Sequence, residues 1–454
     1  MKKHLFYLAY LLWILTSCGD HSEHDTFASG EFKQWAQTPP MGWNSWDCYG
    51  SSVEEHEVRA NVDYMEKYLK PYGWEYIVVD IRWFVENESS KGYNQEDPIY
   101  VLDEYGRYQP AVNRFPSAAG GKGFKELADY VHSKGLKFGI HIMRGIPKEA
   151  VELKLPVKGA GGITADEIFT TKRQCQWLRD NFAIVAERPG AQEYYNSLFE
   201  MYAEWGVDFI KIDDLSRPYH KAEIELIRKA IDQCGRPIVL SASPGQTPVG
   251  EARHISEHAN MWRMVDDVWD KWSYIRHLLD VAQGWYPYIS PGTWPDCDML
   301  PLGRISIRGQ KTGERMTKLT QDEQYTLMTF FTIFRSPLMF GGDLPSNDAF
   351  TLSLLTNKEV LKMHRESTCV RQLFQDNSKV AITSRNPVTN EVYLALFNIS
   401  DKQIMDISVD LKDLGMKEVV KVTNMWTGEE IGTVLDKFSR TVGPHASGLY
   451  KLIN

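Results

Sequence analysis

The sequence has few cysteines and no long basic run, and each absence excludes a class of protein. Its 454 residues include six cysteines, with no Cys-x-x-Cys pair among them. Five follow residue 18 at wide spacings, which argues against a disulfide framework or a zinc site. Lys and Arg number 51 against 60 Asp and Glu, so the net charge is −9. Because phosphate binding requires clustered cations, we expect no nucleic-acid partner.

Long apolar segments are also missing beyond the N-terminus, so we expect no transmembrane helix. Lys2 and Lys3 precede an apolar run over residues 5–15, and Leu-Thr-Ser-Cys18 follows. The charged start and the short run are typical of a secretory signal peptide, and Leu-x-Ser-Cys resembles a bacterial lipobox. We predict a lipoprotein signal peptide over residues 1–18, lipid attachment at Cys18, and an exported bacterial lipoprotein of the cell envelope. A plain signal peptide with an incidental cysteine is the alternative.

Residues 19–37 are predicted to form a polar tether, and a regular strand–helix alternation follows it. Eight such alternations over about 300 residues predict an α/β fold, a (β/α)₈ TIM barrel over residues 38–365. An open doubly wound sheet is the alternative, but no Gly-x-Gly-x-x-Gly motif follows an early strand. The expected strands are residues 41–46, 76–80, 138–142, 209–213, 238–243, 261–267, 288–290 and 336–340. The expected helices include residues 53–69, 124–134, 191–205, 221–232, 271–282 and 321–334.

Two further segments depart from this alternation. After about residue 366 only short strand-like runs remain, which predicts a C-terminal antiparallel β-sandwich over residues 366–454. Between residues 144 and 190 the barrel carries one long excursion that contains Trp177. Segments of this length often cover or wall a binding pocket, and Trp177 is then a candidate for substrate contact. A surface excursion or an oligomer contact is the alternative.

Acidic residues end, or closely follow, four of the expected strands. They are Asp80, the pair Asp213-Asp214, the pair Asp266-Asp267, and Asp296 with Asp298. Barrel enzymes place their chemistry at the C-terminal ends of the strands. A single Asp there is often only the N-cap of the next helix. This alternative would explain one or two of these residues, such as Asp214 or Asp266. Four acidic strand ends favour a catalytic site.

Side-chain alternation along a strand selects one Asp from each pair. Lys211 and Asp213 share parity, as do Arg263 and Asp267. A cation beside a carboxylate lowers its pKa, so Lys211 indicates that Asp213 is an ionised nucleophile. A second carboxylate, shielded by Trp262 or Trp294, could keep a raised pKa and serve as acid and then base. Two such carboxylates are the minimum machinery for glycoside hydrolysis.

Several motifs in chain order together resemble glycoside hydrolase family 27, the α-galactosidase or melibiase family. The resemblance covers residues 38–454. It rests on Thr-Pro-Pro-Met-Gly-Trp-Asn-Ser-Trp at 38–46, Val-Val-Asp at 78–80, Lys-Ile-Asp at 211–213, Trp-Arg at 262–263 with Asp267, Asp-Met-Leu at 298–300, Met-Trp-Thr-Gly-Glu at 425–429 and Pro-His-Ala at 444–446.

The resemblance implies a role for each matching position. It makes Asp213 the nucleophile and Asp267 the acid/base of an exo-acting, retaining double displacement on a terminal sugar of a glycan, with no metal or organic cofactor. Retention requires carboxyl groups about 5–6 Å apart. Trp46 is expected to stack on the sugar, Asp80 to accept hydrogen bonds from its hydroxyls, and Lys211 and Arg263 to donate others. Trp294 and Asp298 complete the expected substrate-binding set.

The sequence departs from the family at Ile81, where α-galactosidases carry a second Asp that helps to hold the hydroxyls on C4 and C6. An unpaired C6 hydroxymethyl group facing Ile81 costs about 1–3 kcal/mol. β-L-Arabinopyranose has the ring stereochemistry of α-D-galactopyranose but lacks C6, and an Ile here resembles the family's β-L-arabinopyranosidases. The hypothesis is therefore a preference for β-L-arabinopyranosides over α-D-galactosides. The alternative is a generalist α-galactosidase in which Ile81 merely packs.

Two other departures leave the substrate open. His141 occupies the place of a family tyrosine, with a purely structural histidine as the alternative. Ser243 follows the fifth strand where α-galactosidases present Glu or Cys toward the C2 hydroxyl. Small residues there could admit an N-acetyl group, as in an α-N-acetylgalactosaminidase-like enzyme, or bind through backbone amides. A surface glycan-binding lipoprotein without catalysis is an alternative of another class, but a binder has no need for both Asp213 and Asp267.

Overall fold

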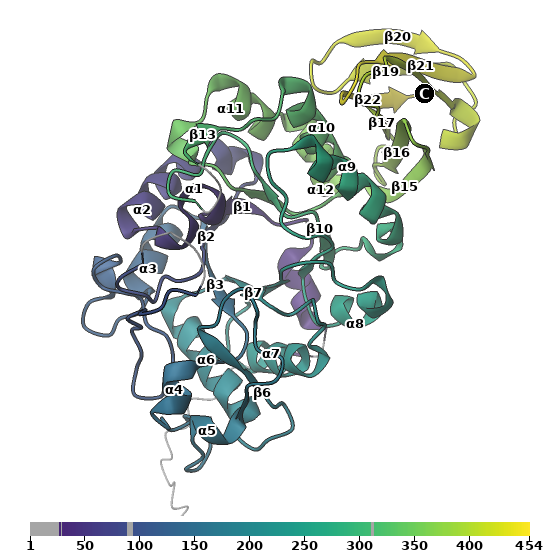
Figure 1. Ribbon diagram of the computed structural model, residues 1–454. Helices are drawn as coiled ribbons and strands as arrows, with labels where there is room; N and C mark the ends of the chain where they lie inside the picture. Colours follow the sequence, from purple (N-terminus) through teal and green to yellow (C-terminus); the bar gives the residue numbers. More distant parts are fainter. Residues whose placement is uncertain (1–26, 29, 89–93, 310–312) are drawn as a thin grey trace, which may run out of the picture.

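Figure 1 shows a computed structural model that describes residues 27–28, 30–88, 94–309 and 313–454. The predicted signal peptide, Cys18 and the first part of the predicted tether lie outside the described residues. Within the described part of the chain, no helix is both long and apolar enough to cross a bilayer.

A closed ring of parallel strands forms the centre of the larger domain, and helices surround it (Figure 1). The ring closes through residues 294–300, because β10 pairs with β9 while β11, three residues later, pairs with β14. The predicted TIM barrel is confirmed. In ring order the strands are β1 (Met41–Asn44), β2 (Tyr76–Val79), β3 (Lys137–Met143), β7 (Phe209–Asp213), β8 (Val239–Ala242), β9 (Met261–Arg263), β10 (Trp294–Asp296), β11 (Met299–Leu300) and β14 (Leu338–Phe340).

Most barrel helices begin and end close to the predicted residues, since apolar side chains at helical spacing face the strands. The helices are α1 (Trp46–Tyr49), α2 (Glu55–Tyr64), α3 (Lys125–Ser133), α6 (Ala191–Trp205), α7 (Lys221–Gln233), α8 (Ala252–Ser256), α9 (Trp272–Val281), α10 (Gln321–Phe334), α11 (Ala349–Leu355) and α12 (Lys358–Glu366). A short hairpin, β12 (Arg304–Ile305) with β13 (Arg315–Met316), lies between β11 and α10.

Two strand predictions are wrong. Residues 288–290 do not form the seventh strand: Tyr288 ends a 3₁₀ helix that begins at Tyr286, and Ser290 forms only an isolated antiparallel bridge with Thr293. The seventh strand is β10. The sixth strand ends at Arg263 rather than at Asp267, and the backbone N–H of Val268 donates to the carboxylate of Asp298 (2.7 Å) instead of to a neighbouring strand.

The excursion after β3 is an ordered unit of its own. It contains α4 (Lys148–Glu152), α5 (Ala165–Ile168) and an antiparallel sheet in the order β4 (Ile146–Pro147), β6 (Asn181–Ile184), β5 (Phe169–Thr170). In Figure 1 this unit lies beside α6, at the opposite end of the molecule from the C-terminal strands.

The C-terminal strands form two antiparallel sheets around an apolar core of their own, so the predicted sandwich is confirmed. They pack against α10, where Thr326 Oγ1 donates to the backbone oxygen of His445 (2.7 Å). The larger sheet has the order β15 (Thr368–Gln375), β16 (Lys379–Arg385), β17 (Val392–Asn398), β22 (Ser447–Ile453), β19 (Val420–Asn424), β20 (Glu430–Val434), and the smaller one pairs β18 (Met405–Asp410) with β21 (Lys437–Val442).

The tether prediction is wrong for its described residues. Residues 31–36 form a 3₁₀ helix, with Phe32 and Ala36 buried. Backbone oxygens of this helix accept hydrogen bonds from the side chain of Asn260 (2.9 Å) and from the N–H of Gly292 (3.1 Å). Because Asn260 and Gly292 precede β9 and β10, this helix covers the N-terminal end of the barrel.

Candidate active site

A cavity of about 580 Å³ opens at the C-terminal ends of the barrel strands and brings ten of the predicted site residues together. The end of each strand or the loop after it supplies them, as barrel geometry requires. The ten are Trp46, Asp80, Ile81, His141, Lys211, Asp213, Ser243, Arg263, Asp267 and Asp298.

The residues that end β1 fix the first rim of the cavity. The side-chain oxygen of Asn44 accepts a hydrogen bond from the N–H of Trp46 (2.9 Å). The hydroxyl of Ser45 accepts one from the N–H of Asp80 at the end of β2 (2.9 Å). The Asn-Ser-Trp sequence therefore holds the end of β1 against the end of β2, and this places Trp46 and Asp80 in one cavity.

Asp80 is fully buried between a histidine and a lysine. His141 Nδ1 lies 2.6 Å from Asp80 Oδ1, and Lys211 Nζ lies 3.4 Å from Oδ2. Burial alone would raise the pKa of Asp80, but His141 and Lys211 outweigh it and hold that pKa well below its ordinary value. Asp80 is therefore an ionised acceptor, and His141 Nδ1 donates to it.

Asp213 faces the other nitrogen of the same imidazole, with His141 Nε2 3.8 Å from Asp213 Oδ2. Burial raises the pKa of Asp213, and His141 and Lys211 only partly oppose the rise. The prediction that Lys211 gives Asp213 a low pKa is therefore wrong, because the ammonium group pairs with Asp80 instead. Asp267 and Asp80 raise the pKa of Asp213 further, so the carboxylates of this cavity lie close enough to repel one another.

Arg263 joins two carboxylates on the opposite side. Its Nη1 lies 2.6 Å from Asp298 Oδ1, and its Nη2 lies 3.3 Å from Asp267 Oδ1. Burial raises the pKa of Asp298 to about 7 despite Arg263. Strand parity does not explain why Arg263 and Asp267 meet, since β9 ends at Arg263. The chain turns after β9, where the N–H of Val268 donates to the carboxylate of Asp298. This turn places Asp267 beside the guanidinium group of Arg263.

The predicted shielding of Asp267 by Trp262 or Trp294 is wrong. The side chain of Asp267 is 54% exposed, so water and a leaving group can reach it. Both tryptophans are fully buried and neither lines the cavity. Trp294 begins β10, at the end of the strand away from the cavity, and its indole N–H donates to the backbone oxygen of Ala36 (2.8 Å). It is not placed to bind substrate there.

Aromatic residues from three parts of the chain form the apolar wall of the cavity: Trp46, Trp177 of the excursion, and Trp269 with Tyr274 after β9. Trp269 and Tyr274 were not among the predicted site residues, although their position just after Asp267 was an available signal. Asp47, a buried cavity residue directly after Trp46, was not among them either.

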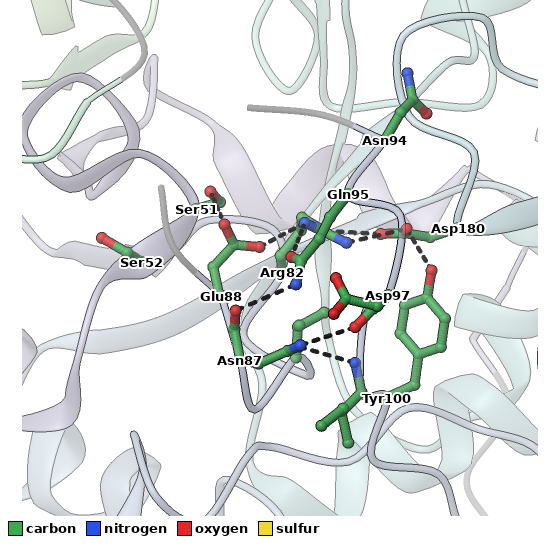
Figure 2. Close-up of polar contacts among 12 residues, drawn as sticks. Ser51, Ser52, Arg82, Asn87, Glu88, Asn94, Gln95, Asp97, Tyr100 and Asp180 are labelled. Atoms are coloured by element: carbon green, nitrogen blue, oxygen red, sulfur yellow. Dashed lines mark hydrogen bonds and ion pairs between the residues drawn. The ribbon is translucent and has the colours of Figure 1, made fainter. Parts of the chain in front are cut away.

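Polar contacts link the loop after β2 to the excursion that carries Trp177; Figure 2 shows those of Arg82 with Glu88 and Asp180. Asn94 accepts a hydrogen bond from the N–H of Arg179 (2.9 Å) and donates to the backbone oxygen of Trp177 (3.3 Å). Arg82, next to Ile81, forms buried ion pairs with Glu88 (2.6 Å) and with Asp180 of the excursion (3.0 Å). The excursion is thus bound to the loop that carries Ile81.

Five buried polar atoms that belong to cavity residues have no hydrogen-bond partner among the described residues. They are Asp47 Oδ2, His141 Nε2, Asp213 Oδ1, Ser243 Oγ and Arg263 Nε. Buried polar groups normally have partners, so these atoms favour a ligand with several hydroxyls. Beside the aromatic wall, such a set suits a sugar.

Comparisons with known proteins agree with this geometry. A family model described as α-galactosidase A matches residues 38–148 and 181–366, and one described as the α-galactosidase C-terminal β-sandwich domain matches residues 377–452. The chain belongs to glycoside hydrolase family 27. It is a glycoside hydrolase, as the sequence analysis predicted. Residues 149–180 of the excursion, which include Trp177, fall outside the match.

Individual relatives include several activities. A family-27 β-L-arabinopyranosidase from Geobacillus stearothermophilus is 52% identical, with a TM-score of 0.91, over 94% of this chain and 99% of that chain. An aspartate-to-alanine variant of that enzyme was solved in complex with arabinose. α-Galactosidase A of Cellvibrio japonicus is 28% identical over 429 residues, 88% of each chain. α-N-Acetylgalactosaminidase of Gallus gallus is 24% identical over 441 residues, 90% of this chain and 92% of that one.

The buried carboxyl group of Asp47 yields a test of the electrostatics. Burial, and then repulsion by Asp298, raises the pKa of Asp47 well above its ordinary value of 3.8. The folded protein then holds a proton that the unfolded chain releases, so the group costs stability increasingly as the pH rises above about 4. We expect Asp47→Asn to raise Tm at pH 8 and to change it little at pH 4, as measured by thermal unfolding.

Asp63 is the control, because its hydrogen bond from Tyr130 lowers its pKa. Asp63→Asn should lower Tm slightly at pH 8 and not at pH 4. An equal gain at both pH values for Asp47→Asn would contradict the assignment of a raised pKa to Asp47.

Proposed function

We propose that this protein is an exo-acting, retaining glycoside hydrolase that prefers terminal β-L-arabinopyranosides and cleaves α-D-galactosides less well. The observation that carries the proposal is Ile81, which lines the cavity beside Asp80. The residue is 1% exposed and belongs to an apolar cluster that includes Trp46.

The proposed reaction uses two carboxylates on either side of the anomeric carbon, Asp213 as the nucleophile and Asp267 as the acid and then the base. Asp213 attacks C1 while Asp267 donates a proton to the leaving oxygen, which gives a glycosyl ester on Asp213. Asp267 then takes a proton from water as the water attacks C1 and releases Asp213. The exposure of Asp267 supports its role as acid and base, because water and the leaving group can reach it. The burial of Asp213 supports its role as nucleophile, because water is excluded from its side of the cavity.

The other polar residues bind the sugar. Ionised Asp80 accepts hydrogen bonds from ring hydroxyls, and Lys211 and Arg263 donate hydrogen bonds to others. Trp46 presents an apolar face for stacking. Asp298 holds Arg263 in place, and His141 Nε2 faces the cavity with its nitrogen unpartnered among the described residues.

The preference for a sugar without C6 follows from the chemistry of Ile81. A galactoside would press its C6 hydroxymethyl group against a branched apolar side chain, and its hydroxyl would lose its hydrogen bonds to water. The cost is about 1–3 kcal/mol, or ten- to a hundredfold in kcat/KM. The β-L-arabinopyranosidase that is 52% identical to this chain adds support.

Replacing Ile81 tests the preference directly. We expect Ile81→Asp to shift the ratio of kcat/KM for nitrophenyl β-L-arabinopyranoside and α-D-galactoside toward the galactoside by about ten- to a hundredfold, because the carboxylate accepts from the C6 hydroxyl. Ile81→Val, which stays apolar, is the matched control and should keep the wild-type ratio. An unchanged ratio in Ile81→Asp would show that Ile81 only packs. Nitrophenyl α-N-acetylgalactosaminide, tested alongside, decides whether the small Ser243 admits a C2 substituent.

Replacing the two catalytic carboxylates separates their roles. Asp213→Ala should reduce hydrolysis of every substrate to background. Asp267→Ala should slow substrates with poor leaving groups by about 10²–10⁴-fold, spare a dinitrophenyl glycoside in the first step, and recover with azide. NMR of the wild-type product should show retained anomeric configuration. An inverted product would contradict the double displacement.

We infer in addition that the chain is exported and anchored by a lipid on Cys18, on the strength of the lipobox-like Leu-Thr-Ser-Cys. Cys18→Ala should move the enzyme from the membrane fraction to the soluble fraction of a bacterial host without loss of activity. Retention of the variant in the membrane fraction would contradict the anchor.

A further inference from the structure

Three neighbouring barrel strands surround the place where the bond to the leaving group breaks. β8 lies between β7 and β9 in the sheet. Asp213 ends β7, and Asp267 lies in the loop after β9. In the proposed double displacement the leaving oxygen lies beside Asp267. The rest of the leaving group, the aglycone, therefore lies at the rim above these three strands.

An exposed ion pair bridges this part of the rim. Arg217, from the loop after β7, donates from Nη1 to Oδ2 of Asp266 (2.9 Å), the residue directly before Asp267. Both side chains line the cavity and are more than half exposed, at 60% and 54%. The pair crosses over Gly245 in the loop after β8, since a Cβ atom there would lie 2.7 Å from Asp266 Oδ1 and 3.5 Å from Arg217 Cζ. The glycine thus leaves room for the pair.

The exposed pair between Arg217 and Asp266 suits a sugar better than it suits folding. Exposed ion pairs contribute little to stability, because water screens both charges. A guanidinium has five N–H donors and a carboxylate two acceptor oxygens, and neighbouring hydroxyls of a pyranose both donate and accept. A diol can therefore bind both groups at once. Because the pair has no net charge, it favours a neutral sugar over an acidic one.

Aromatic side chains lie on the same side of the cavity. Trp269 and Tyr274 follow Asp267 in the chain, and both line the cavity. Tyr274 is partly buried and packs against the apolar cluster that contains Trp269. Aromatic rings beside hydrogen-bonding groups provide the apolar and polar surface that a sugar ring needs. The rim beside Asp267 therefore has both kinds of contact for a second sugar.

We propose that Arg217, Asp266 and Tyr274 bind the aglycone and that this aglycone is a neutral pyranose. The inference rests on the proposed double displacement and adds the class of leaving group to it. Arg217 and Asp266 bind hydroxyls of the second sugar, and Tyr274 contacts its apolar face. Ile81 then selects the sugar that is removed, whereas these three residues select the sugar from which it is removed.

Transfer to an added alcohol tests the site. An acceptor hydroxyl attacks C1 of the glycosyl ester, Asp267 takes its proton, and Asp213 leaves as a carboxylate, so the acceptor occupies the position of the aglycone. The full chain receives whichever nitrophenyl glycoside it hydrolyses faster. Separate reactions contain equal concentrations of methyl β-D-xyloside, methyl β-D-glucoside, methyl β-D-galactoside, methyl β-D-glucuronoside or cyclohexanol.

The measured quantity is the ratio of transfer to hydrolysis. Both products come from the same glycosyl ester, so a defect in the first chemical step does not change this ratio. We expect one of the three neutral pyranosides to give the highest ratio. The glucuronoside and cyclohexanol should give lower ratios, because the first adds a charge and the second lacks the diol.

Variants of Arg217 identify the groups responsible. Arg217→Ala should lower the ratio for the best neutral pyranoside by about 10- to 100-fold. Arg217→Lys should also lower it, because lysine keeps the charge but not the planar fork of donors. Arg253→Ala is the matched control and should keep the wild-type ratio, since Arg253 is also exposed and paired with a carboxylate, that of Glu257 (3.1 Å), but does not line the cavity.

The proposal is overturned if cyclohexanol or the glucuronoside gives a higher ratio than every neutral pyranoside, or if Arg217→Ala keeps the wild-type ratio. Failure of the proposed function gives a different result, in which neither nitrophenyl glycoside is hydrolysed or the product is inverted. The aglycone site then falls with the mechanism on which it depends. Hydrolysis with retention but without a preference among acceptors overturns the aglycone site alone.

Discussion

The catalytic cavity depends on two cations, Lys211 and Arg263, which face a larger number of carboxylates. Lys211 pairs with Asp80, and Arg263 pairs with Asp298 and Asp267. Asp80 contacts both Lys211 and His141, and its pKa is lowered. Where burial dominates, as at Asp213, the pKa rises. The arrangement therefore gives chemically identical side chains different pKa values. Asp80 stays ionised and accepts hydrogen bonds, whereas ionisation of Asp213 costs free energy.

This sorting has a consequence for substrate binding. Carboxylates with raised pKa values are short of hydrogen-bond donors, and the hydroxyls of a sugar supply them. Asp213 Oδ1 and Asp47 Oδ2 lack partners among the described residues. In the proposed mechanism, a bound sugar would satisfy Asp213 and favour the ionised form that the first chemical step requires. Sugar binding and activation of Asp213 would then be coupled through the same hydrogen bonds.

Much of the site could be predicted because the barrel places the end of each strand at one rim. Asp213 ends β7 and Asp80 directly follows β2, so position alone located them. Asp267 was also located, but for a wrong reason, since its place depends on a hydrogen bond between Val268 and Asp298 that local alternation does not show. The prediction that Trp294 binds substrate was wrong, because a tryptophan near a motif does not reveal which end of its strand it occupies. Asp47 was missed because only the folded chain shows that a residue in α1 reaches the cavity.

Ile81 links the proposed selectivity to the electrostatics of the cavity. Lys211 is already engaged by Asp80, Arg263 by Asp298 and Asp267, and the exposed Arg217 by Asp266 (2.9 Å). A second carboxylate at position 81 would thus add negative charge to a cavity whose described cations all have partners. The apolar side chain avoids that repulsion and at the same time removes the acceptor that a C6 hydroxyl needs. The proposed preference for the sugar without C6 is then the form of selectivity that this set of charges tolerates best, and the carboxylate of Ile81→Asp would supply the C6 acceptor at the cost of added repulsion beside Asp80.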